Sequence, residues 1–290
     1  MAFVPLCLVV LAALVHATWN LLAKRAGNAG ADFVFAYNAF ACLAYGPWVA
    51  WLLIEQATAW SPSAVGFVLL SGLLHLGYGL CLQRGYEVAD LSVVYPVARG
   101  TGPLLSSLGA FALLGETPTP GGVSGLLAVV VGIGLISSQG DLAAFRRPGG
   151  QAGIWWGTAT GGLIAAYTVV DAFAVKQLGV HPVILNWSTN LLQFLLLAPL
   201  VARNRVRARQ RMRGRWLLAG AVGLLLPLAY ILVLTALGMG APLSVVAPTR
   251  EMSMMVGALL GMVVLKEAVG AWRLVGCAVM IAGILALGRA

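Results

Sequence analysis

Long apolar segments separated by short polar ones recur along the whole chain. A bilayer core about 30 Å thick needs roughly 20 consecutive apolar residues for one helical span. On that basis we predict ten spans, at residues 2–23, 33–54, 64–83, 91–114, 121–138, 152–175, 182–201, 216–237, 243–265 and 270–288. The pattern therefore predicts an all-α integral membrane protein with ten transmembrane helices joined by short connections.

Composition favours the same class of protein. Sixty per cent of the 290 residues are hydrophobic and 9% are charged, whereas a soluble globular chain carries roughly 25% charged residues. The first span resembles the apolar part of a signal peptide, but no Lys or Arg precedes it, so we expect a mature helix. The four cysteines fall singly within spans, so we expect no disulfide framework, metal site or cofactor. They are Cys7, Cys42, Cys81 and Cys277.

The formal net charge of +9 is concentrated in one connection, Arg203–Arg215, which holds seven arginines between two spans. A cytoplasmic loop that touches anionic membrane lipids explains these arginines better than binding to nucleic acid does. The other basic residues fall almost entirely in alternate connections on the same side. We therefore expect a multi-pass protein of the inner (cytoplasmic) membrane, with this loop in the cytoplasm and both termini on the opposite side.

Two parts of the chain repeat one another. The segment LSVVYPVAR at 91–99 returns as LSVVAPTR at 243–250, and Tyr78 and Tyr230 match at nearly the same shift. This predicts two five-helix repeats, at 1–138 and 152–290, joined by a connector at 139–151. Because five is odd, the second repeat must enter the membrane from the opposite side, and such inverted repeats hold substrate near the membrane midplane in secondary transporters.

Polar residues follow one face of the first span. His16, Asn20 and Lys24 are spaced four residues apart, so they share one stripe of a helix, with Trp19 beside it. Polar and ionisable residues inside a membrane usually face a bundle interior or a water-filled cavity. The alternative for Lys24, and the better explanation for Arg25, is a side chain that extends to the lipid head groups.

The fourth and ninth spans each carry charge. Tyr95 and Arg99 lie in the fourth, and Arg250 and Glu251 lie at the matching depth of the ninth. A guanidinium inside a membrane requires a carboxylate or phosphate, so Arg99 is a candidate substrate ligand. The structural alternative is an internal ion pair of Arg99 with Glu251 or with Asp171.

The sixth span places Tyr167 and Asp171 on one face. Burial raises a carboxyl pKa and a nearby arginine lowers it, so Asp171 and Glu251 are candidate proton-coupling residues. His75 and Tyr78 in the third span are further candidates for the same cavity. Asn186 and Asn190 in the seventh span are interpreted as residues that hold helices together. The predicted substrate-binding residues are His16, Trp19, Asn20, Lys24, Tyr78, Tyr95, Arg99, Tyr167, Tyr230 and Arg250.

Glycine and proline predict packing and bending. Glycines cluster in the fifth and tenth spans, which predicts close helix packing there or a homodimer through these two spans. Glu116 and Glu267 end corresponding helices, which suggests a shared turn and not a substrate contact. Prolines inside spans predict kinks, and they are Pro96, Pro103, Pro227 and Pro248.

Three segments together resemble the drug/metabolite transporter superfamily, in particular its EamA-type members. They are HATWNLLAK at 16–24, YPVARGTGPLLSSLGAFALLGE at 95–116 and APTREMSMMVGALLGMVVLKE at 247–267. The resemblance implies ten helices in two repeats, a cavity built mainly by helices 1, 3, 4, 6, 8 and 9, and transport of amino acids or other metabolites. The second repeat departs from the first, with Ala247 in place of Tyr95 and its arginine one position closer to the proline. Many relatives are thought to keep their termini in the cytoplasm, in contrast to the arginine distribution here.

The leading functional hypothesis is a secondary transporter of a small polar metabolite, an amino acid or organic anion, working by alternating access with proton coupling as an added hypothesis. Sugar phosphates or phosphonates are alternative substrates. No phosphate-binding GxxxxGK[ST] motif is present, so direct use of ATP is not expected. A lipid-carrier flippase remains an alternative, as does an intramembrane enzyme, although HExxH and GxSxG motifs are absent.

Overall fold

The computed structural model describes residues 2–26, 30–55, 60–265 and 270–289, and these residues are helical nearly throughout. In an apolar medium a helix satisfies its backbone hydrogen bonds within one segment, which makes it the natural spanning element. Eight of the helices are long and apolar enough to cross a membrane. The α-helices are α1 Phe3–Ala26, α2 Gly30–Glu55, α3 Pro62–Val88, α4 Leu91–Leu113, α5 Pro120–Ser138, α6 Gly150–Lys176, α7 Pro182–Arg203, α8 Arg205–Met212, α9 Trp216–Gly238, α10 Leu243–Arg250, α11 Met252–Leu265 and α12 Ala271–Arg289.

The two predicted spans that are not among these eight are the fourth and the ninth, each of which carries an arginine inside the span. Helix α4 contains Arg99 and two prolines, which lower its hydropathy. The segment predicted as one span at 243–265 is divided into α10 and α11, which meet at Glu251. Pro248 has no N–H to continue the hydrogen-bond ladder. The N–H of Glu251 bonds to the carbonyl of Pro248, three residues earlier, at 3.1 Å. The ninth predicted span is therefore a broken helix.

The other predicted kinks do not break their helices. α4 continues through Pro96 and Pro103, and α9 continues through Pro227. The arginine-rich connection, predicted as a loop, contains the short helix α8. A 3-10 helix, Leu142–Arg146, lies in the connector between α5 and α6.

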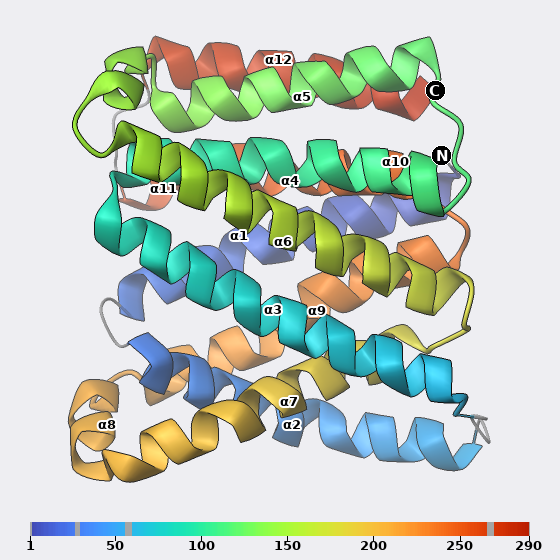
Figure 1. The fold of residues 1–290 in the computed structure, drawn as a ribbon, viewed down its shortest axis with the longest axis vertical. Helices are drawn as coiled ribbons and strands as arrows, with labels where there is room; N and C mark the ends of the chain where they lie inside the picture. Colours follow the sequence, from blue (N-terminus) through green and yellow to red (C-terminus); the bar gives the residue numbers. More distant parts are fainter. Residues whose placement is uncertain (1, 27–29, 56–59, 266–269, 290) are drawn as a thin grey trace.

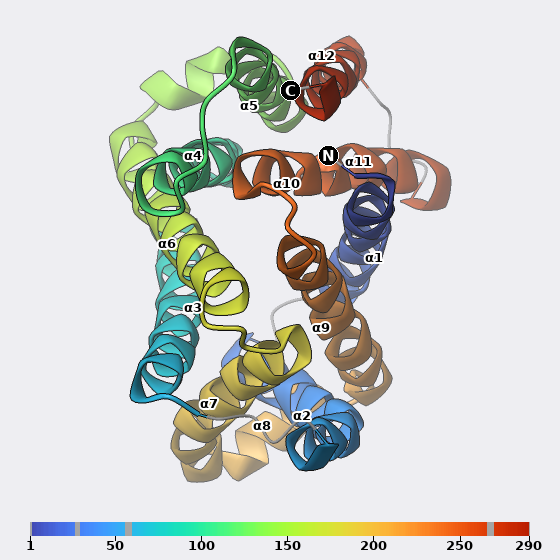
Figure 2. The ribbon, with the colours of Figure 1, turned by 90° about the vertical axis from the view of Figure 1, so that its right-hand side faces the viewer.

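The helices form two walls that are closed at both ends (Figures 1 and 2). One wall is α3 packed on α6, and the other is α1 packed on α9. Helices α2 and α7 contact each other and close one end, while α4 and α10 contact each other and close the opposite end. The paired helices α5 and α12 cover α4 and α10 from outside.

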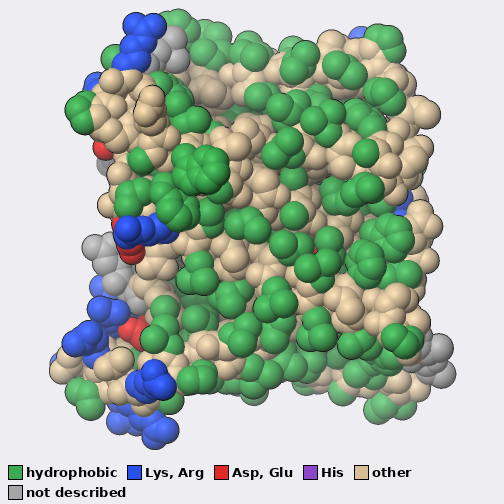
Figure 3. Space-filling model, in the orientation of Figure 1, with side chains coloured by type: hydrophobic (Ala, Val, Ile, Leu, Met, Phe, Trp, Pro, Cys, Tyr) green, Lys and Arg blue, Asp and Glu red, His purple; other side chains and the backbone are tan. Residues whose placement is uncertain are grey.

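Basic residues lie on one edge of the molecule, formed by helix ends and connections. The C-terminal ends of α1, α3 and α5, together with α8, lie on the same side in Figure 1. Lys and Arg side chains gather along that side in Figure 3, which we call the basic side. Both chain termini lie on the opposite side, which we call the terminal side (Figure 1).

Several helices begin on the terminal side with a cap followed by proline. Each capping side chain accepts a hydrogen bond from a backbone N–H that has no partner within the helix, and proline at the first helical position needs no such partner. The sequence dictates these starts locally, since each is a polar residue directly before proline. The capping residues are Ser61 for α3, Thr119 for α5 and His181 for α7.

The glycines of α5 and α12 bring these two helices together within one chain. A Cβ added at Gly132 would lie 2.8 Å from the carbonyl oxygen of Gly276, and one added at Gly125 would lie 2.7 Å from that of Gly283. Only glycine permits so close a backbone approach. The predicted packing role is thus met inside the monomer, and the predicted homodimer stays a prediction.

Candidate functional site

A cavity of about 440 Å³ lies between the two walls. Its lining residues come from α1, α2, α3, α4, α6, α7, α9 and α10. Gln83 and Tyr86, near the end of α3 on the basic side, line the cavity and are exposed. Towards the terminal side the space is filled by a buried apolar cluster that includes Val68, Val175 and Leu237. The cavity therefore extends from the interior towards the basic side and is closed towards the terminal side.

The cavity brings together the residues singled out in the sequence. Asp171 and Glu251, the two candidate proton-coupling residues, are each 1% exposed and lie behind side chains that line the cavity. Lys24 is also a predicted ligand, but its side chain lies outside the described part of the structure. The predicted substrate-binding residues that line the cavity are His16, Trp19, Asn20, Tyr78, Tyr95, Arg99, Tyr167, Tyr230 and Arg250.

One end of the cavity is charged. Arg99 on α4 donates to Glu251 at 3.3 Å, and Arg250 lies 3.6 Å from the other carboxylate oxygen of Glu251. Arg99 also lies 3.5 Å from His16 Nε2 and 5.4 Å from the centre of the Tyr95 ring. The internal ion pair considered as the alternative for Arg99 is thus present, and Arg99 still lines the cavity.

The Arg99–Glu251 pair joins corresponding positions of the two halves. Each residue stands three places after a proline, Pro96 or Pro248, in the matched segments. The break between α10 and α11 occurs at Glu251 itself, which places the carboxylate between the two guanidiniums. Two cations share one carboxylate here, so this end keeps one positive charge in excess.

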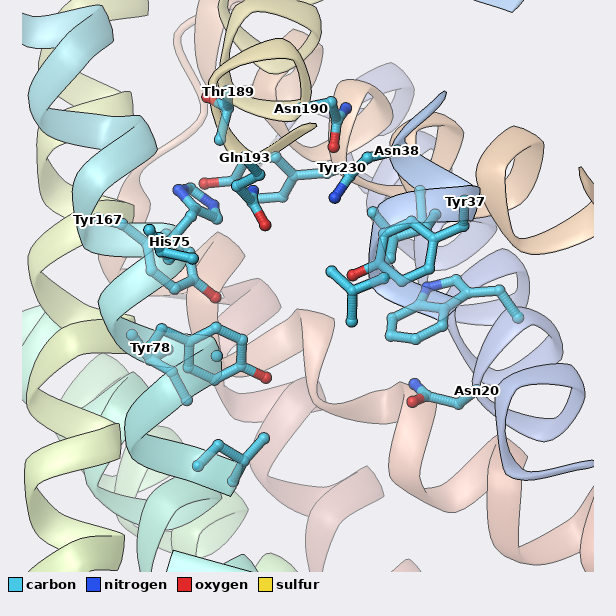
Figure 4. Close-up of a pocket in the computed structure, with 18 of the residues that line it drawn as sticks. Asn20, Tyr37, Asn38, His75, Tyr78, Tyr167, Thr189, Asn190, Gln193 and Tyr230 are labelled. Carbon is cyan, nitrogen blue, oxygen red and sulfur yellow. The ribbon is translucent and has the colours of Figure 1, made fainter. Parts of the chain in front are cut away.

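An aromatic wall with a carboxylate behind it forms one side of the cavity. Tyr230 donates to Asp171 at 2.5 Å, and His75 Nε2 lies 3.9 Å from the same carboxylate oxygen. The His75 ring stacks on Tyr167 with 3.9 Å between centroids, and Tyr78 packs edge-on against Tyr167 at 5.8 Å. The hydroxyls of Tyr78 and Tyr167 point into the cavity (Figure 4), whereas that of Tyr230 is directed to Asp171. Such rings attract ammonium groups, especially when a carboxylate lies nearby.

The other end of the cavity, where α2 meets α7, carries amides. Asn38, which sequence reasoning missed, is fully buried and lines the cavity. Asn190 donates to Asn186 within the same helix at 3.0 Å, and both line the cavity. This hydrogen bond lies within α7 and not between helices, and the role of the two asparagines in holding helices together stays a prediction. The internal repeat offered a signal for Asn38, since Asn38 and Asn190 are separated by 152 residues, as are Tyr78 and Tyr230.

Some polar atoms of the cavity have no hydrogen-bond partner among the residues that the structure describes. They include both amide atoms of Asn38, the indole N–H of Trp19 and the Nε of Arg250. A buried polar group without a hydrogen bond costs about 1–3 kcal/mol. All three side chains line the cavity, so each is a candidate partner for a polar molecule inside it.

Glu116 links α6 and α10 on the terminal side through hydrogen bonds. Its carboxylate accepts from the backbone N–H groups of Leu243 at 2.6 Å and Ser244 at 2.9 Å, from the Ser244 hydroxyl at 2.7 Å and from Lys176 Nζ at 3.2 Å. Burial raises the pKa of Glu116, but the bonds from Ser244 and Leu243 and the Lys176 charge outweigh it, so this pKa lies below its usual value. Glu116 thus caps α10, which agrees with a structural turn, and Glu267, its counterpart, lies outside the described residues.

The arrangement defines a class of protein: a multi-pass membrane protein that encloses a charged and aromatic cavity among its helices. Residues 4–138 match the EamA-like transporter family. This match confirms the resemblance of the chain to the drug/metabolite transporter superfamily. A solved crystal structure shares the fold, with a TM-score of 0.78 at 19% identity over 98% of each chain. No curated protein matches the chain in sequence.

Proposed function

We propose that the protein is a secondary transporter that carries a small polar metabolite, an amino acid or another organic anion, by alternating access. The observation that carries the proposal is the cavity itself, which is walled by charged and aromatic residues from both halves of the chain. Charged groups inside a membrane are costly and mark substrate or ion pathways. A cavity of about 440 Å³ also has the size of a small-molecule site.

Two inverted five-helix repeats, 1–138 and 152–290, are part of this proposal. Helix α4 spans 91–113, and α10 with α11 spans 243–265, which is the same interval 152 residues later. Contacts between helices also occur in matching pairs. The packing of α1 on α9 corresponds to that of α6 on α3, and α2 on α9 corresponds to α7 on α3. Rocking of one repeat against the other would move the closure from the terminal side to the basic side.

The charges of the cavity favour a substrate with a carboxylate. Arg99 and Arg250 exceed the single carboxylate of Glu251 by one positive charge. A substrate carboxylate would compete with Glu251 for Arg99, and the planar guanidinium suits it. An amino group would lie against the aromatic wall, with the negative charge of Asp171 behind it. An amino acid therefore satisfies more of the cavity than a simple organic anion does.

Proton coupling and orientation complete the proposal. A substrate carboxylate that competes for Arg99 would change the partners of Glu251, so Glu251 and Asp171 are the candidate residues for proton coupling. The basic side faces the cytoplasm of the inner membrane by the positive-inside rule. In that orientation the cavity described here extends towards the cytoplasm.

The test begins with a thermal-shift screen of amino acids, organic anions, sugar phosphates and phosphonates on the purified protein, because a ligand of the folded state raises its apparent stability. Hits are then followed by counterflow in proteoliposomes. Saturable counterflow that is lost in Arg99→Ala and weakened in Arg99→Lys supports the proposal. The matched control is Arg209→Ala, an exposed arginine of α8.

Two results contradict the proposal. One is a hit that binds equally well to wild type and to both Arg99 variants. The other is an absence of saturable counterflow for every hit. Product formation in detergent would instead favour the enzyme alternative.

A further inference from the structure

We infer that the amide end of the cavity, formed by Asn38, Asn190 and Gln193, is a specificity subsite. It would hold a neutral substrate group that both donates and accepts hydrogen bonds, such as a carboxamide or a hydroxyl. The inference rests on the proposed transport function and deepens it, because it assigns chemistry to the end of the substrate away from its charged groups.

Asn38 provides the primary observation. Its side chain is fully buried on α2, and within the described part of the chain neither its amide oxygen nor its amide nitrogen has a hydrogen-bond partner. An amide that only held helices together would bond across the α2–α7 contact. Instead, Asn38 lines the cavity and its amide points into it (Figure 4). A donor and an acceptor side by side fit a group that offers one of each.

The neighbours of Asn38 complete a neutral polar surface. Asn190 and Gln193 come from α7 and lie beside it at the same end of the cavity (Figure 4). Asn190 uses its amide nitrogen within α7, where it donates to Asn186. None of these residues is charged. The subsite therefore favours a neutral polar group over a carboxylate. A carboxylate is favoured at the opposite end of the cavity, where Arg99 lies.

The geometry of the fold separates the two ends. Arg99 and Arg250 belong to α4 and α10, whereas Asn38 and Asn190 belong to α2 and α7, which close the opposite end of the helix walls (Figures 1 and 2). A substrate that spans the cavity would place its charged groups near the arginines and the aromatic wall. Its distal group would then reach the amides.

The experiment compares three amino acids of similar length: L-glutamine, with a carboxamide, L-methionine, with an apolar end, and L-glutamate, with a charged end. Binding to the purified full-length protein is measured by isothermal titration. We expect wild type to bind glutamine about 10- to 100-fold more tightly than methionine, the factor for leaving a buried amide unpaired. Asn38→Leu, which is close in shape, should reverse this preference.

Stability provides a second readout that does not depend on the ligand. Replacing an unpartnered buried amide by an apolar group of similar shape should preserve or raise the unfolding temperature of the ligand-free protein. A clear loss of stability in Asn38→Leu would instead indicate a structural role and overturn the inference. Asn204→Leu, at an exposed asparagine beside α8, is the matched control and should change neither preference nor stability.

The outcomes separate the inference from the proposed function. If glutamine and methionine bind equally to wild type, or if Asn38→Leu leaves the preference unchanged, the subsite is refuted while transport stands. If none of the three amino acids binds or exchanges, the amino-acid part of the proposed function fails as well. Tighter binding of glutamate than of glutamine would also overturn the inference, because the amide end would then hold a charge.

Discussion

Glu251 forms ion pairs with two guanidiniums, which makes its replacement the most informative perturbation of the fold. Arg99 lies 3.3 Å and Arg250 lies 3.6 Å from its two carboxylate oxygens. Glu251→Gln keeps the shape but leaves both cations without a carboxylate. Removing one partner of a buried ion pair costs about 3–5 kcal/mol, because a charge remains buried and uncompensated.

The arginine variants should cost less than the glutamate variant. In Arg99→Met the carboxylate still has Arg250, so the expected loss is that of a hydrogen bond to a charged group, about 1.5–3 kcal/mol. The assay is equilibrium unfolding in mixed detergent micelles, followed by tryptophan fluorescence. An equal or larger loss in Arg99→Met than in Glu251→Gln would refute the arrangement in which Glu251 pairs with both arginines.

Three further predictions concern packing, capping and orientation. Gly132→Ala should lower the unfolding temperature because the added Cβ meets the Gly276 backbone. Gly134→Ala, with open space around it, should leave stability unchanged or raise it by about 0.4–1 kcal/mol, because alanine reduces the conformational entropy of the unfolded chain. Equal effects in the two variants would contradict the α5–α12 packing. Glu116→Gln should destabilise the protein at pH 7. Because the pKa of Glu116 is depressed in the folded state, its contribution to the free energy of unfolding is present above the unfolded-state pKa and is lost as pH falls through the folded-state pKa. Unfolding temperatures from pH 7 to pH 3 should therefore converge for wild type and variant, and a gap that widens on acidification would exclude the cap. An alkaline phosphatase fusion at the C-terminus should be active and one within residues 203–215 inactive, and the reverse pattern would show that the basic side is not cytoplasmic.

Sequence alone predicted most of the helices, because twenty apolar residues in a row leave few other structures in a membrane. The limits at 121–138 and 182–201 differ by only one or two residues from α5 and α7. The break at Glu251 was not predicted. A proline permits a helix either to bend or to stop, and the other prolines of similar spans, such as Pro96 and Pro227, lie in continuous helices.

Charged and aromatic residues of the cavity lining were predicted from the sequence, whereas the amide of Asn38 was not. Arg99 and Glu251 stand out because ionisable residues are rare within spans. Asn38 did not stand out, since a single amide in an apolar helix is compatible with many roles. Its place opposite the arginines depends on how α2 and α7 cross, which is a tertiary property that helix periodicity does not contain.

The central claim is that one cavity between two repeats becomes accessible to each side of the membrane in turn. The most direct measurement labels a single cysteine at Ala98, a buried residue of the cavity lining, in a protein whose four native cysteines are replaced. A membrane-impermeant maleimide is applied from either side of proteoliposomes of known orientation, with and without substrate. The account predicts labelling from both sides, with substrate changing the ratio of the two rates. Labelling from the basic side alone under every condition would contradict it.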